Sequence, residues 1–205
     1  MSKLYSERTH FTVRMVENMA KMKILFGGAS SEHEVSLVSA YSVLTNIPKD
    51  KYDVMCIGIT KKGHWLCYPG EYEDIRTGEW ENNPDNCTAV ISPDTVSKGV
   101  ILLGADDKCY IRRLDAVFPV LHGRFGEDGT VQGLLELAGI PYVGCGVLAS
   151  AVCMDKAVAN ALFEANGVPH TRWLAADRWE IESDLEGVCE GVEKKLGWPV
   201  FVKPA

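Results

Sequence analysis

The chain has 205 residues, of which 46% are hydrophobic and 24% are charged, and its formal net charge is -7. This is the composition of a globular protein with a sizeable core, so disordered and fibrous classes are excluded. The acidic surplus argues against a nucleic-acid partner, because a phosphate backbone is usually met by an excess of lysine and arginine.

Seven cysteines are spread along the chain without a C-x-x-C pair, and most of them lie in apolar runs. This pattern predicts reduced, mostly buried thiols in a cytoplasmic protein rather than a disulfide or zinc framework. No segment approaches the roughly 20 apolar residues of a membrane span. Residues 1–21 carry charged side chains and no apolar stretch, so we predict a disordered N-terminal extension rather than a secretory signal.

The first predicted strand covers Met22–Phe26, and a glycine-rich turn leads from it into a helix over Glu32–Ile47. Ser31 followed by Glu34 fits a capping box at the start of the helix, and Pro48 ends it. Helical spacing predicts that its buried stripe consists of Val35, Val38, Leu44 and Ile47.

The next segments predict strands joined by short turns. A buried strand over Tyr52–Thr60 is followed by a turn and a short strand over His64–Tyr68. Residues 69–98 are rich in proline, glycine and polar residues, and we interpret them as an insertion with one strand at Cys87–Ser92. Val100–Leu103 and Cys109–Arg113 then flank the loop Gly104–Asp107 in a predicted β-hairpin.

Another buried strand is predicted at Asp115–Leu121, followed by a helix over Thr130–Ala138 that Gly139 ends, and a strand over Ile140–Val143. Beyond a boundary near residues 145–150, the predicted elements are helices over Val147–Val152 and Met154–Asn166, a strand over His170–Ala175, a helix over Ile181–Leu196 and a strand over Pro199–Lys203. The alternation of strands and helices predicts an α/β fold.

Glu32 is the first candidate functional residue, because it opens a helix directly after the turn that contains Gly27 and Gly28. A carboxylate in the first turn also interacts well with the helix dipole, so a structural role is the competing interpretation. In a ligand crevice the same carboxylate would hold an ammonium group. A Rossmann dinucleotide site is disfavoured, because the glycines lack the G-x-G-x-x-G spacing and Glu32 and Glu34 would crowd a pyrophosphate.

His122 is the second candidate, because it ends a predicted buried strand and begins a loop that also carries Arg124, Glu127 and Asp128. A structural, hydrogen-bonded histidine is the competing interpretation, and Glu127 and Asp128 are expected to cap the following helix. Because ligands of open α/β sheets bind at strand C-termini, we expect the Gly27 turn and the His122 loop to share one crevice.

Two lysines stand out near the end of the chain, although each would be an ordinary surface lysine by default. Lys203 follows the predicted buried strand, so its ammonium would need an anionic partner or an opening to water. A triphosphate would be a suitable partner. Lys156, at the start of the predicted helix over Met154–Asn166, is the second such candidate.

Several segments resemble, in the same order, those of the D-alanine–D-alanine ligase family, and they cover the chain from about residue 22 to its end. They are Phe26–Leu37, Leu121–Gly133, Pro141–Gly144, Ala149–Lys156 and Phe201–Pro204. The turn at Gly58–Trp65 and the long insertion are similar to the larger members, which include the D-Ala–D-Ser and D-Ala–D-lactate ligases of vancomycin resistance.

The resemblance implies a pre-ATP-grasp domain with a mainly parallel, Rossmann-like sheet at residues 22–147, and the first part of an ATP-grasp domain at residues 148–205. It implies an ATP-dependent, Mg²⁺-dependent ligase of peptidoglycan precursor synthesis that joins two D-alanines through an acyl phosphate. The implied roles are an ammonium ligand for Glu32, a contact with the D-alanine methyl for Val35, a site near the reacting carboxylates for His122, and ATP phosphate ligands for Lys156 and Lys203.

The family's magnesium ligands, mobile lid and oxyanion-stabilising arginine do not match any segment of these 205 residues. We therefore expect an N-terminal fragment of a cytoplasmic, homodimeric ligase, with no metal ligands of its own and no turnover alone. Two alternatives stay open at this point. One is a non-catalytic dimerisation or ligand-binding module, and the other is a parent that uses D-serine or D-lactate as its second substrate.

Overall fold

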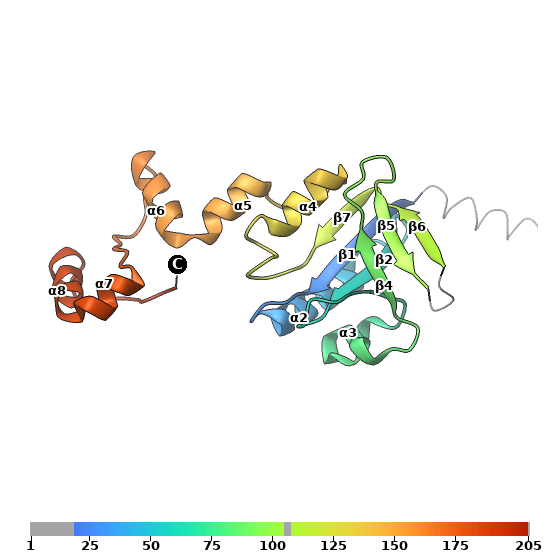
Figure 1. Cartoon of the computed structure of the whole chain (residues 1–205), viewed down its shortest axis with the longest axis horizontal. Helices are drawn as coiled ribbons and strands as arrows, with labels where there is room; N and C mark the ends of the chain where they lie inside the picture. Colours follow the sequence, from blue (N-terminus) through green and yellow to red (C-terminus); the bar gives the residue numbers. More distant parts are fainter. Residues whose placement is uncertain (1–18, 105–107, 205) are drawn as a thin grey trace, which may run out of the picture. The chain divides into compact units, whose positions relative to one another are not determined.

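The computed structural model describes residues 19–104 and 108–204 and divides the chain into two compact units, Met1–Val147 and Leu148–Ala205 (Figure 1). Residues 1–18 of the predicted extension and 105–107 of the predicted hairpin loop lie outside the described residues. The assignment of the second unit to an ATP-grasp domain stays a prediction.

The first unit is built on one seven-stranded sheet with the order β6-β5-β4-β3-β2-β1-β7. The strands are β1 (Ala20–Gly27), β2 (Tyr52–Ile59), β3 (Trp65–Tyr68), β4 (Cys87–Ile91), β5 (Gly99–Leu103), β6 (Cys109–Arg113) and β7 (Ala116–Pro119). The α/β class is confirmed. The expectation of a mainly parallel sheet holds only for β2, β1 and β7, because β2 to β6 pair antiparallel in chain order, β3 and β4 across the segment that contains α3 and η1.

The strand β1 pairs parallel with β2 on one side and β7 on the other, and it is buried on both faces, as is usual for a strand with parallel neighbours. Leu25 belongs to a core cluster that includes Val131 and Leu135 of α4 (Thr130–Ala138). Ile24 and Phe26 point to the opposite cluster, which α2 (His33–Asn46) and α3 (Tyr72–Thr77) cover. The two helical layers therefore lie on opposite faces of the sheet (Figure 1).

The helix α2 corrects two predictions. Val35 and Val38 are exposed, and its buried residues are His33, Ser36, Leu37, Ala40 and Leu44. Leu44 is buried as predicted, but Val35 and Val38 are not, because the polar residues His33 and Ser36, which bond to the turn, occupy the buried face. No side chain caps the helix; instead the Ser30 hydroxyl accepts a hydrogen bond from the Glu32 N–H at 3.0 Å, so the predicted capping box is absent.

The predicted insertion contributes to the core. Its strand is β4, but it also contains α3 and a 3₁₀-helix, η1 (Glu79–Asn82), which the composition did not indicate. Trp80 in η1 is fully buried, with its ring centroid 4.8 Å from that of Phe26 and 6.4 Å from that of Tyr68. One large apolar side chain thus attaches a polar segment to the sheet.

The end of the first unit follows the predictions more closely. The helix α4 has the predicted bounds, and Gly139 ends it at φ 62°. The predicted strand Ile140–Val143 is reduced to a single parallel bridge between Tyr142 and Val117.

The second unit contains α5 (Val147–Met154), α6 (Lys156–Ala165), α7 (Arg178–Ser183) and α8 (Leu185–Lys195). The predicted strands at His170–Ala175 and Pro199–Lys203 are wrong for the described residues, since neither segment has a partner strand there. Most of the predicted helix Ile181–Leu196 is present as α8, but its start is wrong, because Asp184 ends α7 and caps α8 by accepting the Gly187 N–H at 2.9 Å.

None of the seven cysteines forms a disulfide, but the expectation that most are buried is wrong. Cys56 is buried and Cys67 and Cys87 are half-buried, whereas the exposed ones are Cys109, Cys145, Cys153 and Cys189. The apolar runs that contain the last four do not enter a core among the described residues. Within those residues no helix has the length and apolarity that a membrane crossing requires.

Candidate functional site

The candidate site lies where β1, β2 and β7 end. The three strands are parallel, and β1 lies between β2 and β7. The chain continues from β1 to β2 on one side, and β7 is added later on the other side. Such a switch point leaves a crevice beyond the strand C-termini, where open α/β sheets bind ligands. The Gly27–Gly28 turn and the loop after Leu121 meet there, as the sequence predicts.

The turn after β1 requires glycine. Gly27 and Gly28 have φ of 83° and 108°, and a Cβ on Gly27 would lie 2.3 Å from the Ile59 carbonyl oxygen. The Gly27 N–H donates to the Ser36 hydroxyl at 2.8 Å, and this hydroxyl donates to the Val120 carbonyl. Ser36 therefore connects the turn to the end of β7, a role that its polarity hid from the sequence analysis.

Glu32 lies beside the loop that follows Leu121, called the His122 loop below. Its carboxylate approaches Gly123 so closely that a Cβ there would lie 2.3 Å from Glu32 Oε2. The Ser30 hydroxyl holds the same two segments together, because it donates to the His122 carbonyl at 2.8 Å. Glu32 is exposed, so its carboxylate is free to meet a ligand.

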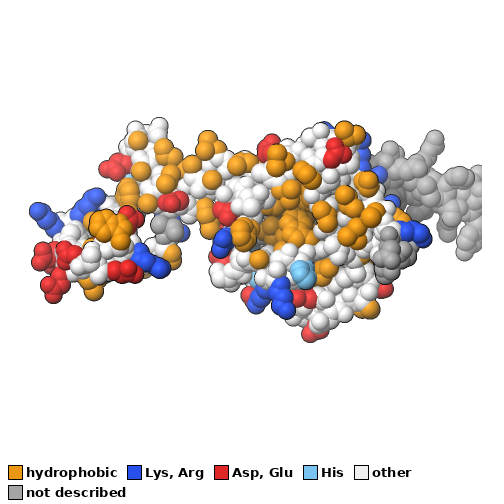
Figure 2. All heavy atoms as spheres, in the orientation of Figure 1, with side chains coloured by type: hydrophobic (Ala, Val, Ile, Leu, Met, Phe, Trp, Pro, Cys, Tyr) orange, Lys and Arg blue, Asp and Glu red, His pale blue; other side chains and the backbone are white. Residues whose placement is uncertain are grey.

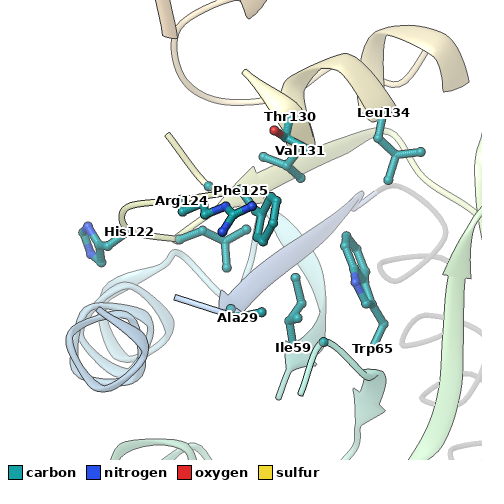
Figure 3. Close-up of a pocket in the computed structure, with 13 residues that line it drawn as sticks. Ala29, Ile59, Trp65, His122, Arg124, Phe125, Thr130, Val131 and Leu134 are labelled. Atoms are coloured by element: carbon teal, nitrogen blue, oxygen red, sulfur yellow. The ribbon is translucent and has the colours of Figure 1, made fainter. Parts of the chain in front are cut away.

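His122 is half-buried, and its Nε2 lies 3.0 Å from the Ser39 hydroxyl of α2. Ser39 in turn donates to the Val35 carbonyl at 2.9 Å. The imidazole therefore turns toward α2, and Figure 3 shows it pointing away from the other labelled side chains of the apolar pocket that His122 helps to line. The Glu32 carboxylate lies close to Gly123, the residue after His122. His122 lines the apolar pocket and Glu32 does not.

The carboxylates of the His122 loop accept hydrogen bonds from its backbone. Glu127 accepts the Gly123 N–H at 2.7 Å, and Asp128 accepts the N–H groups of Phe125 and Thr130 at 2.9 and 3.0 Å. Burial acts to raise the pKa of Asp128, but these hydrogen bonds outweigh it and lower the pKa. Asp128 thus reaches the first residue of α4, whereas Glu127 stabilises the loop rather than the helix.

His33 is a buried part of the site that the sequence analysis missed. Its Nδ1 lies 2.9 Å from the Gly28 carbonyl oxygen, so Nδ1 is the donor, and its Nε2 lies 3.7 Å from Glu81 Oε1 of η1. A histidine between two glutamates gave no sequence signal for burial. It fixes the position of the Gly28 turn from the side of α2.

The remaining candidates are exposed side chains. Val35 is 54% exposed on α2. Lys156 and Lys203 are exposed in the second unit, and the buried strand expected before Lys203 is absent, since Phe201 is 94% exposed. Among the described residues no group of three His, Cys, Asp or Glu side chains could hold a metal ion.

Comparisons with known proteins match the first unit directly. The family described as "D-ala D-ala ligase N-terminus" matches residues 21–145. The chain is 49% identical over 195 residues to a D-alanine–D-alanine ligase of Acetivibrio thermocellus and 48% identical over 185 residues to that of Caldicellulosiruptor bescii. These alignments cover 90% of this chain but only 52% and 50% of the relatives, so the chain spans about half of their length.

Solved structures give the same picture. The VanG D-Ala:D-Ser ligase of Enterococcus faecalis matches with a TM-score of 0.76 and 41% identity, over 91% of this chain and 52% of that one. The D-alanine–D-alanine ligase of Coxiella burnetii matches with a TM-score of 0.72 and 31% identity, over 87% and 50% of the two chains.

Proposed function

This chain belongs to the D-alanine–D-alanine ligase family, and from that premise we propose that it supplies the first D-alanine site of an ATP-dependent ligase of peptidoglycan synthesis. The proposal includes a cytoplasmic location and a homodimer formed through the first unit. The first substrate is proposed to be D-alanine, because the names of both kinds of relative, the D-Ala–D-Ala and the D-Ala:D-Ser ligases, include it. The second substrate is not assigned to residues of this chain.

The approach of Glu32 to the His122 loop carries the proposal. D-Alanine presents an ammonium and a carboxylate on one carbon, so its site needs groups of opposite character a few ångströms apart. The Glu32 carboxylate lies beside Gly123, adjacent in sequence to His122, and can hold the ammonium. The imidazole of His122, which Ser39 orients, can donate to the carboxylate or offset its charge.

The proposed reaction transfers the γ-phosphoryl group of ATP to the D-alanine carboxylate, and the amine of the second substrate then displaces phosphate from the acyl phosphate. In this scheme Glu32 binds and orients the first D-alanine, and His122 balances charge at the reacting carboxylate. Lys156 and Lys203 are proposed to hold ATP phosphates, which suits two exposed ammonium groups. No step is assigned to a metal held by this chain, because its described residues offer no metal cluster.

Titration of the isotope-labelled chain with D-alanine tests the site. We expect amide shifts at residues 28–39 and 121–127, and at least about a tenfold loss of affinity in Glu32→Gln, which removes the charge that holds the ammonium. Glu34→Gln is the matched control, because Glu34 pairs with Lys61 instead. Equal affinity of wild type and Glu32→Gln would remove Glu32 from the site, and the absence of any D-alanine shifts would contradict the proposed function.

An assay of phosphate release from MgATP in the presence of D-alanine tests whether this chain is active alone. We expect no turnover by the 205-residue chain, since it spans about half the length of its relatives. Robust turnover would show that the proposed need for further ligase sequence is wrong. Sedimentation of the same sample tests the proposed homodimer, which a purely monomeric chain would contradict.

A further inference from the structure

An apolar pocket of about 280 Å³ opens on the α4 face of the same sheet edge. Its walls come from the turn after β1, the end of β2, β3, the His122 loop and α4, and they include Ile59, Trp65, Leu121, Phe125, Val131 and Leu134. Figure 3 shows these side chains converging from several elements, and Figure 2 shows hydrophobic side chains gathered on one face of the first unit. The pocket shares His122 with the proposed D-alanine site, but the Glu32 carboxylate that would hold the ammonium is not part of its lining.

One permanent charge stands at this pocket. Arg124 is the only lining residue with a permanent charge. Within the described parts of the chain, Arg124 forms no salt bridge. Its guanidinium lies 4.5 Å from the centroid of the Phe125 ring, an arrangement that leaves the N–H edges of the guanidinium available. The carboxylates of the same loop, Glu127 and Asp128, bond to backbone N–H groups and form no salt bridge with Arg124.

Phe125 is held in a conformation that costs energy. Its φ is 66°, in the left-handed region that a bulky residue rarely adopts, and its side chain is 41% exposed despite being aromatic. Asp128 stabilises this conformation by accepting the Phe125 N–H at 2.9 Å. Residues with such strained backbone conformations cluster at active sites and ligand-binding sites.

We propose that this pocket binds a small carboxylic acid with an apolar tail. The tail would lie between Trp65, Leu134 and Phe125, and the carboxylate would take a two-point bond from Arg124. The volume suits a compact ligand of metabolite size. Because Leu121, His122 and Gly126 all line the pocket, a bound acid would also contact the His122 loop.

Calorimetric titration of the chain with three probes tests the ligand class. The probes are 3-phenylpropionate, which has both features, 3-phenylpropan-1-ol, which lacks the charge, and acetate, which lacks the tail. We expect 3-phenylpropionate to bind at least about tenfold more tightly than either of the others. Equal binding of acid and alcohol, or no binding of the acid, would overturn the proposal independently of the D-alanine titration.

Two variants locate the site, each with a matched control. Arg124→Gln should lower the affinity for the acid to that for the alcohol, whereas Arg112→Gln on β6 removes the same charge elsewhere and should leave binding unchanged. Leu134→Trp should fill the pocket and abolish binding, whereas Leu137→Trp, on the exposed side of α4, should not. Thermal unfolding verifies that each variant is folded.

A second copy of the chain could occupy an apolar pocket instead of a small acid. Sedimentation distinguishes these two occupants. If Leu134→Trp dissociated a dimer that Leu137→Trp left intact, the pocket would be a protein interface and the proposal of an acid site would be wrong. An unchanged oligomeric state together with loss of acid binding would support the proposal.

Discussion

The two units of this chain form their helices by different means. In the first unit, α2, α3 and α4 have no side-chain cap, and buried side chains hold them on the sheet. In the second unit, Asp155 and Asp184 cap α6 and α8, yet Ser150 and Ala159 are its only buried residues among those described. Local capping can therefore specify a helix, but tertiary burial is what makes it part of a core.

The exposed apolar residues of the second unit sharpen the contrast. Trp179, Trp198, Phe201 and Val202 are each more than half exposed, whereas Trp80 in the first unit is fully buried. A burial-based account of stability predicts that equivalent changes in the two units will have unequal effects.

Thiol reactivity should show the largest difference between the units. Burial raises the pKa of Cys56 from its ordinary value near 9 to about 12 and that of Cys67 to about 11. At pH 8 the thiolate fraction of Cys56 is then about a thousandfold lower than that of an ordinary thiol. We expect iodoacetamide, followed by mass spectrometry, to label the exposed Cys153 and Cys189 rapidly and Cys56 only after unfolding. Rapid labelling of Cys56 in the folded chain would contradict this burial.

Removal of a tryptophan should separate the units next. Trp80→Ala leaves a large cavity beside Phe26 and Tyr68, so we expect a loss of about 3–5 kcal/mol of unfolding free energy. Trp179→Ala, the matched change in α7, should stay within about 0.5 kcal/mol because the side chain is 67% exposed. Urea unfolding measures both values, and equal losses would show that Trp179 is buried in solution.

Adding a methyl group should have opposite signs in the two units. In Gly58→Ala the new Cβ would lie 2.3 Å from Trp80 and 2.8 Å from Phe26, so we expect a destabilisation of about 1–3 kcal/mol. Gly191→Ala in α8 meets no neighbouring atom within 4 Å and should increase helix stability by about 1 kcal/mol. Denaturant unfolding and circular dichroism measure the two effects, and a neutral Gly58→Ala would mean that Trp80 can move.

The smallest effect should come from a helix cap. Asp184→Ala removes the acceptor for the Gly187 N–H and should cost α8 about 1 kcal/mol, read as faster amide exchange in Leu185–Lys195. Glu186→Ala, in the same first turn, is the control. Glu32→Ala should not change exchange in α2, since Leu37 and Leu44 hold that helix. Faster exchange throughout α2 would show that its start depends on Glu32.

Local sequence signals predicted much of this molecule correctly. Three central strands, the bounds of α4 and its end at Gly139 follow from apolar runs and turn residues. The predicted meeting of the Gly27 turn and the His122 loop follows from the rule that parallel strands end at one edge. The family, which the comparisons confirm, was predicted from ordered motifs rather than from periodicity.

Other features depended on contacts between distant segments. The buried face of α2 contains His33 and Ser36 because their partners, Gly28 and Val120, lie on other elements. Trp80 is buried because Phe26 and Tyr68 meet it from two strands. No pattern within one element carries that information.

The sequence by itself determined the α/β class, the three parallel strands and the bounds of α4, because these depend on neighbours a few positions away. Only the tertiary structure decided which residues of α2 are buried, how Trp80 enters the core, how closely Glu32 approaches the His122 loop and where the Arg124 pocket opens. Those features depend on burial and hydrogen bonds between residues far apart in the chain, whose energies no local pattern records.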